Sequence, residues 1–395
     1  MIIAFDTWTL WNPLRNSGIH RYSLMLLKEL EKLSVINDSI RLRVFYADGY
    51  SDETSALSSS SRFELVPAPL LKFHRSWKLA GLATAAYRIN ADVIFSPTFY
   101  VCPWGPTPTV TTIHDLTPIT SPVFKGRRNL VDRFFLWNAA HLSRTCIVDS
   151  ECTKNDLIRI YGTDPEKVKI VYLGYDRYRF NAEPADIPAQ KLLFQRLVVH
   201  SPYILHHGTI QPRKNLERLI QAYRLLMHKR PSCDASLVLA GPLGWEYEGI
   251  LRTAREAGYP GNIIFTGPLS EDELPLLVKG ATLCVLPSLY EGFCLPMIES
   301  MACGVPTIAS NASCLPEVSG NVLRYFDPLS VDDITDKMDK SLHDWHLREE
   351  LTRNGIRRAA KFSWESCAQE TLRILVATYE QCTGQTCKPT SSAPV

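Results

Sequence analysis

The sequence of 395 residues lacks the marks of several protein classes. Its 11 cysteines form no Cys-x-x-Cys pair, which excludes the thiol spacing of zinc ribbons and redox motifs. The formal net charge is only +2, so no bulk positive field points to a nucleic-acid partner. The amino terminus lacks the basic region and long apolar stretch of a signal peptide, and is expected to be a strand. We therefore expect a cytoplasmic protein whose cysteines are small buried apolar residues in a reducing compartment.

No apolar run in the sequence is suited to crossing a membrane. The longest uncharged run lies between Asp92 and His114. It contains four prolines, which a single spanning helix would not tolerate. We interpret this run as a strand, a loop and a second strand.

The sequence does contain a repeated alternation of strand and helix patterns. Its length suits two domains of roughly 200 residues each. The alternation predicts the α/β class, with two Rossmann-like, doubly wound domains that each hold a parallel sheet covered on both faces. The expected strands are 1–6, 42–47, 91–97, 109–115, 145–151, 167–174, 203–208, 235–241, 262–267, 283–288 and 305–310. The expected helices are 16–33, 76–89, 129–142, 215–229, 245–258, 271–281 and 296–303.

Changes in composition suggest where the domains begin and end. The first domain is expected at 1–185 and the second at 200–365, with a polar, proline-bearing stretch within 176–202 that suits a linker. A last helix is expected at 366–382. The tail 383–395 is polar and rich in Ser, Thr and Pro, so it is expected to be disordered.

The most informative segment is 283–310, whose pattern predicts strand, turn, helix and strand. The first strand is expected to end near Ser288, and the helix to begin around Pro296, a favoured place for proline. Gly304 follows the helix, where a left-handed residue is expected, and the next strand begins at Val305. The amino terminus of this helix should lie at the carboxyl end of the sheet, where open α/β folds bind ligands.

Backbone amides and two acids surround this helix start. The free amides near Leu295 and Met297 are candidates for holding a diphosphate. Glu291 precedes the helix and Glu299 is expected in its first turn, and carboxylates accept hydrogen bonds from sugar and ribose hydroxyls. The alternative is that Glu299 only complements the helix dipole and that Glu291 is a solvated loop acid.

A basic loop forms a second candidate site. A strand is expected to end at Gly208, Arg213 and Lys214 follow in the loop, and Asn215 can cap the next helix. Arg binds a diphosphate through two parallel contacts, while Lys acts as a point charge. The alternative is an ordinary solvated basic loop.

Two further positions lie in the first half of the chain. His114 and Asp115 follow a β-branched strand directly, at the edge of the sheet. The alternative for His114 is a structural histidine whose hydrogen bonds are satisfied. Gly18 lies between the first strand and the first helix, where any tight turn would favour glycine.

Together these segments resemble the family-four retaining glycosyltransferases. That family has a pair of glutamates separated by seven residues, as Glu291 and Glu299 are, with Gly292, Phe293 and Pro296 between them. The similarity runs through most of the chain. The similar segments are 17–22, 167–176, 207–223, 291–306, 313–320 and 362–365.

The resemblance implies a GT-B architecture, in which two Rossmann-like domains face each other across a cleft and the last helix, 366–382, returns to the first domain. The first domain would bind the acceptor and the second the nucleotide sugar. The implied catalytic residues are His114, Arg213, Lys214 and Glu291. The implied donor-binding residues are Gly18, Gly208, Arg213, Lys214, Gly292, Phe293, Cys294, Leu295, Pro296 and Glu299.

The resemblance also implies individual roles for these residues. Glu299 would bind the ribose, and Glu291 would contact the transferred sugar. Arg213 and Lys214 would neutralise the diphosphate. His114 would lie beside the donor sugar.

Three further points concern Gly18, Cys294 and a motif that the sequence lacks. Gly18 would allow its loop to approach the donor closely. Cys294 stands where the family commonly has glycine, so the turn there is not expected to be strongly left-handed. No Asp-x-Asp motif precedes a plausible sugar site, so no metal or other cofactor is expected.

The expected reaction is retaining transfer of a sugar, with GDP-mannose as the expected donor, to a glycan or lipid-linked oligosaccharide in surface polysaccharide synthesis. The segment 124–142 has basic and aromatic residues that suit peripheral contact with the inner face of a membrane. The alternative there is a core helix with a charged outer face. Two other interpretations of the whole chain are a non-catalytic nucleotide-sugar binding protein and an epimerase or phosphorylase on the same architecture.

Overall fold

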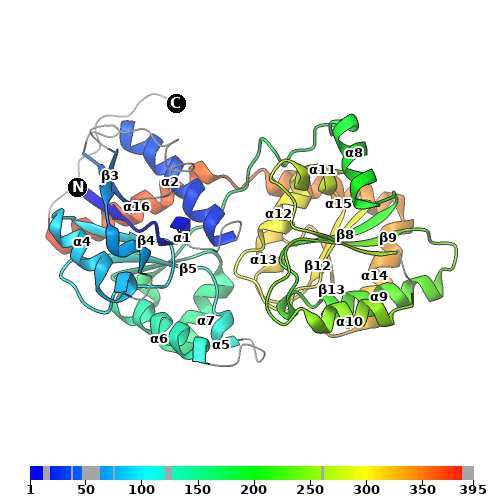
Figure 1. Ribbon diagram of the computed structural model, residues 1–395, viewed down its shortest axis with the longest axis horizontal. Helices are drawn as coiled ribbons and strands as arrows, with labels where there is room; N and C mark the ends of the chain where they lie inside the picture. Colours follow the sequence, from blue (N-terminus) through cyan, green and yellow to red (C-terminus); the bar gives the residue numbers. More distant parts are fainter. Residues whose placement is uncertain are drawn as a thin grey trace. The chain divides into compact units, whose positions relative to one another are not determined.

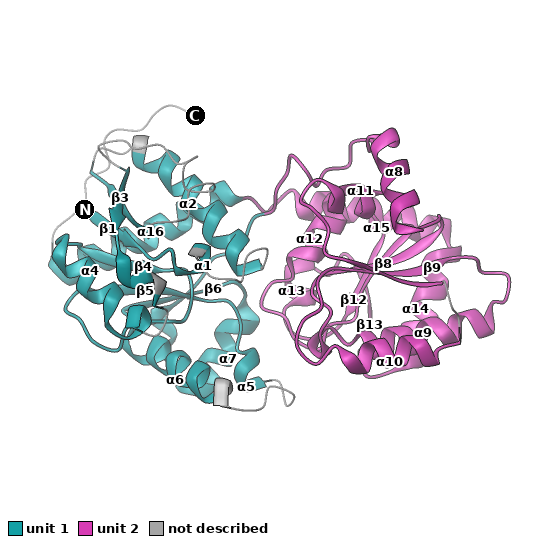
Figure 2. Ribbon diagram, in the orientation of Figure 1, with its two compact units in different colours: residues 1–174, 364–395 teal, residues 175–363 magenta. Residues whose placement is uncertain are grey.

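The computed structural model of the chain describes residues 1–11, 18–36, 39–46, 63–73, 76–120, 127–258 and 262–384. The chain divides into two compact units (Figure 2). Unit 1 is Met1–Gly174 together with Trp364–Val395, and unit 2 is Tyr175–Ser363. Each unit is described by itself below. Most of the tail 383–395, expected to be disordered, lies outside the described residues.

The boundary between the units differs from the expected one. Unit 2 begins at Tyr175, and the expected linker within 176–202 belongs to it and carries helix α8 (Ile187–Leu197). The side chain of Asp186 caps this helix. Because α8 also packs on α11 (Glu273–Lys279), this stretch is part of the second fold rather than a hinge.

Unit 1 is built on a seven-stranded sheet in which neighbouring strands are parallel, in the order β3-β2-β1-β4-β5-β6-β7 (Figure 1). The central strands β4 and β6 are buried at every position, as expected for a parallel sheet covered on both faces. The edge strand β3 is not predicted from the sequence, because it includes an exposed glutamate and a proline and so lacks a continuous apolar run. The bounds are β1 (Ile2–Phe5), β2 (Arg41–Tyr46), β3 (Phe63–Pro67), β4 (Val93–Ser96), β5 (Thr109–Ile113), β6 (Thr145–Val148) and β7 (Val168–Ile170).

The helices of unit 1 include one that comes from the far end of the chain. α16 packs on α2, β4 and β6, and Figure 1 shows it beside the blue elements of the amino terminus. Thr378 Oγ1 of α16 lies 3.0 Å from Thr145 Oγ1 at the start of β6. This confirms the prediction that the last helix returns to the first domain. The bounds are α1 (Trp8–Trp11), α2 (Gly18–Ile36), α4 (Leu82–Arg88), α5 (Thr117–Thr120), α6 (Arg127–Leu142), α7 (Glu151–Tyr161) and α16 (Trp364–Thr383), with the short turns η1 (Pro69–Lys72), η2 (Trp77–Gly81) and η3 (Pro165–Lys167).

Unit 2 repeats the scheme with a six-stranded parallel sheet in the order β10-β9-β8-β11-β12-β13. The prediction of two doubly wound α/β domains is therefore confirmed. The strands are β8 (Tyr203–His207), β9 (Ser236–Ala240), β10 (Ile263–Gly267), β11 (Leu283–Leu286), β12 (Thr307–Ser310) and β13 (Arg324–Phe326). The other elements are η4 (Pro212–Lys214), α9 (Leu216–Lys229), α10 (Glu248–Glu256), α12 (Leu295–Ala302), α13 (Leu315–Ser319), α14 (Val331–His343) and α15 (Trp345–Ala359).

Some elements of unit 2 differ from the expected ones. The helix expected from 245 begins at Glu248, because Glu246 has a φ of 51° that helical backbone does not allow. The strand expected from Val305 begins at Thr307, because the Val305 N–H still donates to the Ser300 carbonyl at the end of α12. The elements β13, α13, α14 and α15 are not among those predicted. Among the described residues, no helix combines the length and the apolar character needed to span a bilayer.

Candidate active site

The basic loop after β8 is packed into unit 2. Arg213 and Lys214 lie in η4, and Lys214 is only 6% exposed. Asn215 has a left-handed φ of 59°, and its side-chain amide donates to the carbonyls of Pro287 and Pro328 at 3.1 and 2.7 Å. The alternative of a solvated loop and the expected cap by the Asn215 side chain are therefore both wrong. Segments that follow the neighbouring strands pack on this loop.

The two cations of the loop meet the carboxylate of Glu291. Arg213 Nη1 donates to Glu291 Oε2 at 2.5 Å, and Lys214 Nζ donates to Oε1 at 2.5 Å. Ser288 Oγ donates to Oε1 at 2.7 Å. Since Glu291 is 5% exposed, the alternative of a solvated loop acid is wrong. These four residues are called the charge cluster below.

The charge cluster keeps Glu291 ionised. Burial by itself would raise the pKa of Glu291, but the charges of Arg213 and Lys214 and the hydrogen bonds from Lys214 and Ser288 outweigh it and lower that pKa to about 2. Two cations and one carboxylate leave the cluster with a net positive charge. Such a cluster suits an anionic group, and Arg is adapted to planar phosphate contacts.

Ser313 holds the backbone of Glu291 from a distant part of the chain. Its Oγ donates to the Glu291 carbonyl at 2.6 Å and accepts the Glu291 N–H at 3.2 Å. Hydrogen bonds therefore hold Glu291 at both its side chain and its main chain.

Two glycines bring bare backbone to the charge cluster. Gly208 has a φ of 135°, and a Cβ placed on it would lie 3.8 Å from Lys214 Nζ and 3.9 Å from Pro296 Cγ. Gly241, after β9, has a φ of 140°, and a Cβ there would clash with the carbonyl oxygen of Gly208. The ends of β8 and β9 approach each other closely because Gly241 lacks a side chain, while the missing side chain of Gly208 leaves space beside Lys214 and Pro296.

The start of α12 differs from the prediction in three ways. Cys294 has φ 70° and ψ 67°, so the expectation that this turn avoids the left-handed region is wrong. The Met297 amide donates to the Cys294 carbonyl at 3.0 Å and is not free. Glu299 is the fifth residue of the helix and lies in its second turn. Pro296 does lie in the first turn, as predicted. The buried Cys294 side chain fixes a conformation that costs a non-glycine residue about 1–2 kcal/mol.

The remaining signature residues are buried around this helix. Gly292, Phe293 and Leu295 are buried, and the Phe293 ring packs edge-on against Phe362 with centroids 5.4 Å apart. Gly304 has a φ of 73°, which confirms the left-handed residue predicted after the helix.

Glu299 lies inside unit 2 beside a histidine of β8. It is 2% exposed, and its Oε2 lies 3.7 Å from His207 Nδ1. His207 Nε2 lies 2.9 Å from Ser300 Oγ. An acid in the second turn with a buried partner does not match the alternative that Glu299 only complements the helix dipole.

His114 is held at the carboxyl end of the sheet in unit 1. It follows β5, its Nδ1 lies 2.6 Å from Asp149 Oδ2, and its Nε2 lies 3.1 Å from the carbonyl of Pro97. The Tyr22 ring packs edge-on against the imidazole with centroids 4.6 Å apart. Residues after the neighbouring strands β4 and β6 therefore fix both ring nitrogens.

One proton is held between His114 and Asp149. A carbonyl only accepts, so Nε2 carries hydrogen toward Pro97, and Nδ1 shares its contact with the carboxylate. Burial acts to lower the pKa of His114, but the charge and hydrogen bond of Asp149 outweigh it and raise that pKa. Burial raises the pKa of Asp149. The imidazole of His114 is therefore held in one orientation by the Asp149 carboxylate and the Pro97 carbonyl.

Gly18 occupies a different place from the one expected. It is the first residue of α2 and is exposed. α1 lies between it and β1, so Gly18 does not follow the first strand directly. The segment before it, 12–17, is outside the described residues.

The predicted site residues therefore fall into three groups. Gly208, Arg213, Lys214, Glu291 and Pro296 lie together in unit 2, with Gly292, Phe293, Cys294 and Leu295 in the segment that joins Glu291 to Pro296. Glu299 lies farther along α12. His114 and Gly18 belong to unit 1.

Sequence reasoning missed four residues that shape these groups: Asp149, Gly241, Ser288 and Ser313. Asp149 follows β6 as His114 follows β5, and Gly241 follows β9 as Gly208 follows β8. Because these positions follow neighbouring strands, Asp149 and Gly241 could have been predicted from the sequence to lie near His114 and Gly208. The two serines carry no such signal, because their partner Glu291 is defined only by the folded chain.

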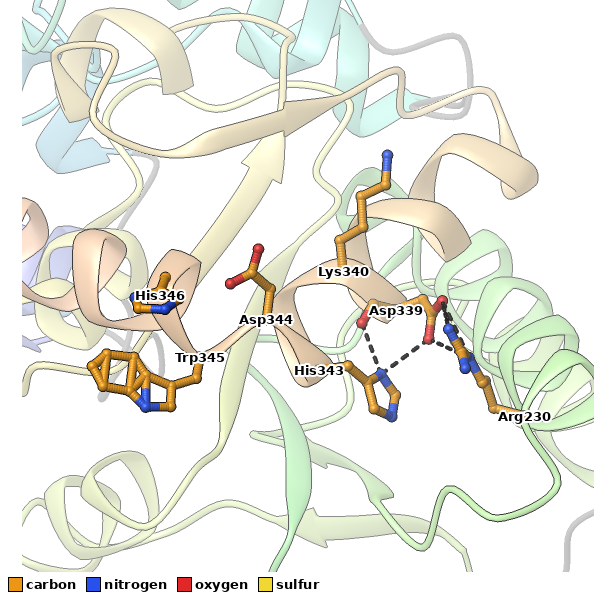
Figure 3. A pocket seen from close by; sticks show the side chains of 7 residues that line it. All are labelled: Arg230, Asp339, Lys340, His343, Asp344, Trp345 and His346. Carbon is orange, nitrogen blue, oxygen red and sulfur yellow. Dashed lines mark hydrogen bonds and ion pairs between the residues drawn. The ribbon is translucent and has the colours of Figure 1, made fainter.

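One pocket of unit 2 is lined by residues outside the charge cluster. It has a volume of about 490 Å³ and surrounds the carboxyl end of α14. Figure 3 shows Arg230, Asp339 and His343 joined by hydrogen bonds and ion pairs on one side, with Trp345 and His346 on the other. A set of three or more His, Cys, Asp or Glu side chains suited to a metal ion does not occur in the described ranges.

Comparisons with known proteins match both units. Residues 16–179 match the family Glycosyltransferase Family 4, and residues 192–358 match Glycosyl transferases group 1. The O-antigen chain mannosyltransferase B of Escherichia coli is 31% identical over 386 residues, which cover 94% of this chain and 98% of that protein. The serotype-specific mannosyltransferase WbdA of Escherichia coli is 28% identical, and the match covers 96% of this chain but 48% of WbdA.

Solved structures share the fold. Anabaena HepE in complex with UDP and glucose superposes with a TM-score of 0.71 at 18% identity, covering 95% of this chain and 99% of that one. Sucrose-phosphate synthase from Thermosynechococcus elongatus gives a TM-score of 0.73 at 17% identity, with 97% and 99% covered. With two parallel α/β units and a relative matched along almost its full length, this chain belongs to the family 4 glycosyltransferases of the GT-B fold.

Proposed function

We propose that this glycosyltransferase moves mannose from GDP-mannose, with retention of anomeric configuration, to a glycan or lipid-linked oligosaccharide in surface polysaccharide synthesis. The names of the relatives matched along most of the chain support mannose and this pathway class. We further propose that the protein works in the cytoplasm, with peripheral contact to the inner face of the membrane.

The charge cluster carries this proposal. When the bond between the anomeric carbon and the phosphate oxygen breaks, the nucleoside diphosphate takes the electron pair. Arg213 and Lys214 stabilise that developing negative charge in a buried site, where such stabilisation is strongest. Bare backbone at Gly208 lets a phosphate oxygen approach Lys214 without steric conflict.

Glu291 fixes the two cations and faces the transferred sugar in this proposal. With a pKa of about 2 it is ionised at neutral pH, so it has no proton to give to the leaving group. The acceptor hydroxyl forms its bond on the same face of the sugar, and its proton passes to a donor phosphate oxygen. Same-face return retains the anomeric configuration.

The other site residues position the donor in this proposal. Glu299 accepts hydrogen bonds from the ribose hydroxyls. His114, held by Asp149 and the Pro97 carbonyl, lies beside the donor sugar. Gly18 allows its segment to approach the donor.

Donor choice is tested by transfer of labelled mannose from GDP-mannose to an acceptor glycan. We expect transfer, and we expect GDP and GDP-mannose to raise the melting temperature by mass action. Stabilisation by UDP-glucose but not by GDP-mannose would refute the donor. Binding without any transfer would favour the alternative of a non-catalytic nucleotide-sugar binding protein.

Metal independence is part of the proposal, because cations and amides meet the phosphate charge. Activity should persist in excess chelator. Complete loss of transfer that manganese restores would refute this part.

A further inference from the structure

The outer face of α6 in unit 1 is apolar. Its inner face, including Phe135, Leu136 and Ala139, is buried in the core. Leu130, Phe134 and Trp137 follow one another at helical spacing on the other face and are 67%, 49% and 48% exposed. The alternative of a core helix therefore holds for the inner face, but the described outer face carries this apolar row as well as charge.

Charge on the outer side of α6 is positive. The acidic residue in this helix, Asp132, is buried and accepts a hydrogen bond from Tyr100 Oη at 2.7 Å. Arg133 is exposed beside the apolar row. The apolar row therefore has a cation, and no described carboxylate of α6, at its surface.

A cavity of about 360 Å³ lies at the carboxyl end of α6, whose last residues His141 and Leu142 line it. Its lining includes Trp104, His141, Ser143, Arg144 and Lys167, and none of its lining residues is Asp or Glu. Lys167 Nζ donates to the His141 carbonyl at 3.0 Å. In the described part of the chain, Arg144 and Lys167 make no ion pair.

The cavity has two further features of an anion site. Ser143 is buried, and its hydroxyl has no hydrogen-bond partner among the described residues. The nearest acid in sequence to Lys167 is Glu166, which is exposed and faces Lys169 at 3.9 Å. The positive charge of the cavity is therefore not neutralised by the protein.

The cavity is separate from the site residue His114. Arg144 and Lys167 directly precede β6 and β7, so the cavity lies at the amino-terminal edge of the sheet, whereas His114 follows β5 at the opposite edge. A ligand in the cavity therefore leaves the His114–Asp149 pair untouched.

We propose that α6 and this cavity form a membrane-docking surface: the row of Leu130, Phe134 and Trp137 enters the interfacial layer of a bilayer, and Arg144 and Lys167 bind the phosphates of anionic lipid headgroups. An apolar row flanked by cations matches the two terms of interfacial binding, apolar burial and attraction to anionic lipid. Trp favours the interface because its ring is apolar and its N–H is polar. The inference rests on the proposed membrane contact and is independent of the donor.

The test is flotation of the full chain with vesicles of phosphatidylglycerol and phosphatidylethanolamine, compared with phosphatidylcholine vesicles. We expect binding to the anionic vesicles that weakens as salt is added. R144Q/K167Q should lower the partition coefficient roughly 10- to 30-fold, since each cation near an anionic surface contributes about fivefold. F134S/W137S should lower it by a comparable or larger factor.

Matched controls come from exposed residues of unit 2. R252Q/K361Q removes the same charge, and W345S removes an equally exposed tryptophan. Both should bind vesicles like the natural chain, and melting curves report folding of every variant. Unchanged binding in R144Q/K167Q and F134S/W137S, or equal loss in the controls, would overturn the proposal.

Two other outcomes would assign the surface differently. Self-association without vesicles that F134S/W137S abolishes would make this face an interface between copies of the chain. Stabilisation by inorganic phosphate without vesicle flotation would make the cavity a free-anion site. Vesicle binding by a protein that fails to use GDP-mannose would refute the donor while leaving the docking surface intact.

Discussion

Lys214 and Glu291 are buried partners whose separate removal has unequal chemical consequences. Losing the lysine leaves a buried carboxylate that keeps Arg213 and Ser288 but has lost one of its two cations, which is costly in a buried site. Losing the carboxylate leaves two cations at the place where the donor phosphates are proposed to bind. Substituting Lys214 and substituting Glu291 should therefore change the stability of the fold and the rate of transfer to different degrees.

We predict that K214M lowers the free energy of unfolding by roughly 2–4 kcal/mol, because one partner of a buried ion pair is removed. Turnover should fall on the order of 100-fold or more, the scale for losing one charge-stabilising group. Chemical denaturation and steady-state kinetics measure the two effects. The control K361M removes an exposed lysine and should change stability by at most about 0.5 kcal/mol.

A double variant distinguishes the two effects of Lys214. K214M/E291Q removes both charges, so part of the stability lost in K214M should return while turnover stays low. K214M as stable as the natural chain would contradict the burial of the pair.

We predict that E299Q and E291Q change different kinetic constants. E299Q should mainly raise the donor KM, because ribose contacts bind ground state and transition state alike. E291Q should mainly lower kcat, because the transferred sugar and the two cations act in the transition state. E291Q should bind free GDP at least as tightly as the natural chain, since the cluster loses its negative charge. Calorimetric titration of GDP checks this, and loss of GDP binding in E291Q alone would reverse the assignment.

At the scale of elements, the end of β9 comes close to the end of β8 because Gly241 has no side chain in the path of the Gly208 carbonyl. Both Gly241 and Gly162 have positive φ, but only Gly241 has backbone in the path of a Cβ, whereas Gly162 has nothing within 4 Å. Comparing substitutions at Gly241 and Gly162 therefore measures the energetic cost of the contact between Gly241 and Gly208.

We predict that G162A costs about 1 kcal/mol, from backbone strain alone. G241A should cost more, up to about 4 kcal/mol, because the clash with Gly208 must be relieved by moving the end of β8. It should also lower turnover, since Gly208 adjoins Lys214. Equal melting temperatures for the two variants would show that the strand ends yield without cost.

Elements with strong patterns could be predicted from the sequence, and elements without them could not. The buried strands β4, β6 and β11 are short apolar runs, and their positions are close to those predicted. β3 and β13 are short edge strands with charged residues, so their pattern is weak. Residues 176–202 have linker composition, yet a cap at Asp186 starts α8 within them.

The site could likewise be predicted only in part from the sequence. Arg213, Lys214 and Glu291 follow strands at the carboxyl end of one sheet, so their meeting could be expected. Their pairing in a buried cluster could not, because it depends on loops that pack over η4. The left-handed backbone of the buried Cys294 could not be predicted either, because the ordinary preference at such a position is for glycine.

At the scale of the whole molecule, unit 1 is made from both ends of the described chain. Trp364, Cys367, Thr371 and Leu375 of α16 are buried, and α16 packs on α2. Unit 2 holds its sheet entirely within Tyr175–Ser363. The two units therefore differ in how they depend on the last helix.

We predict that a chain ending at Ser363 loses the cooperative unfolding transition of unit 1 and keeps that of unit 2. Removing α16 exposes apolar surface of α2 and of the sheet that no other described element of unit 1 covers in its place. Scanning calorimetry with limited proteolysis checks this. A chain ending at Gly384 keeps α16 complete and should show both transitions, while two transitions in the shorter chain would contradict the prediction.

The return of α16 also sets an order of assembly during synthesis. Residues 1–174 leave the ribosome before unit 2, but the helix that completes their fold is made only after all of unit 2. At roughly 5–20 residues per second, translation of Tyr175–Ser363 takes on the order of 10–40 s. Unit 2 has time to fold in that interval, whereas the amino-terminal unit waits with the surface under α16 uncovered. The part of the protein that is made first is thus the part that is finished last, and in that interval it is the part most in need of a chaperone.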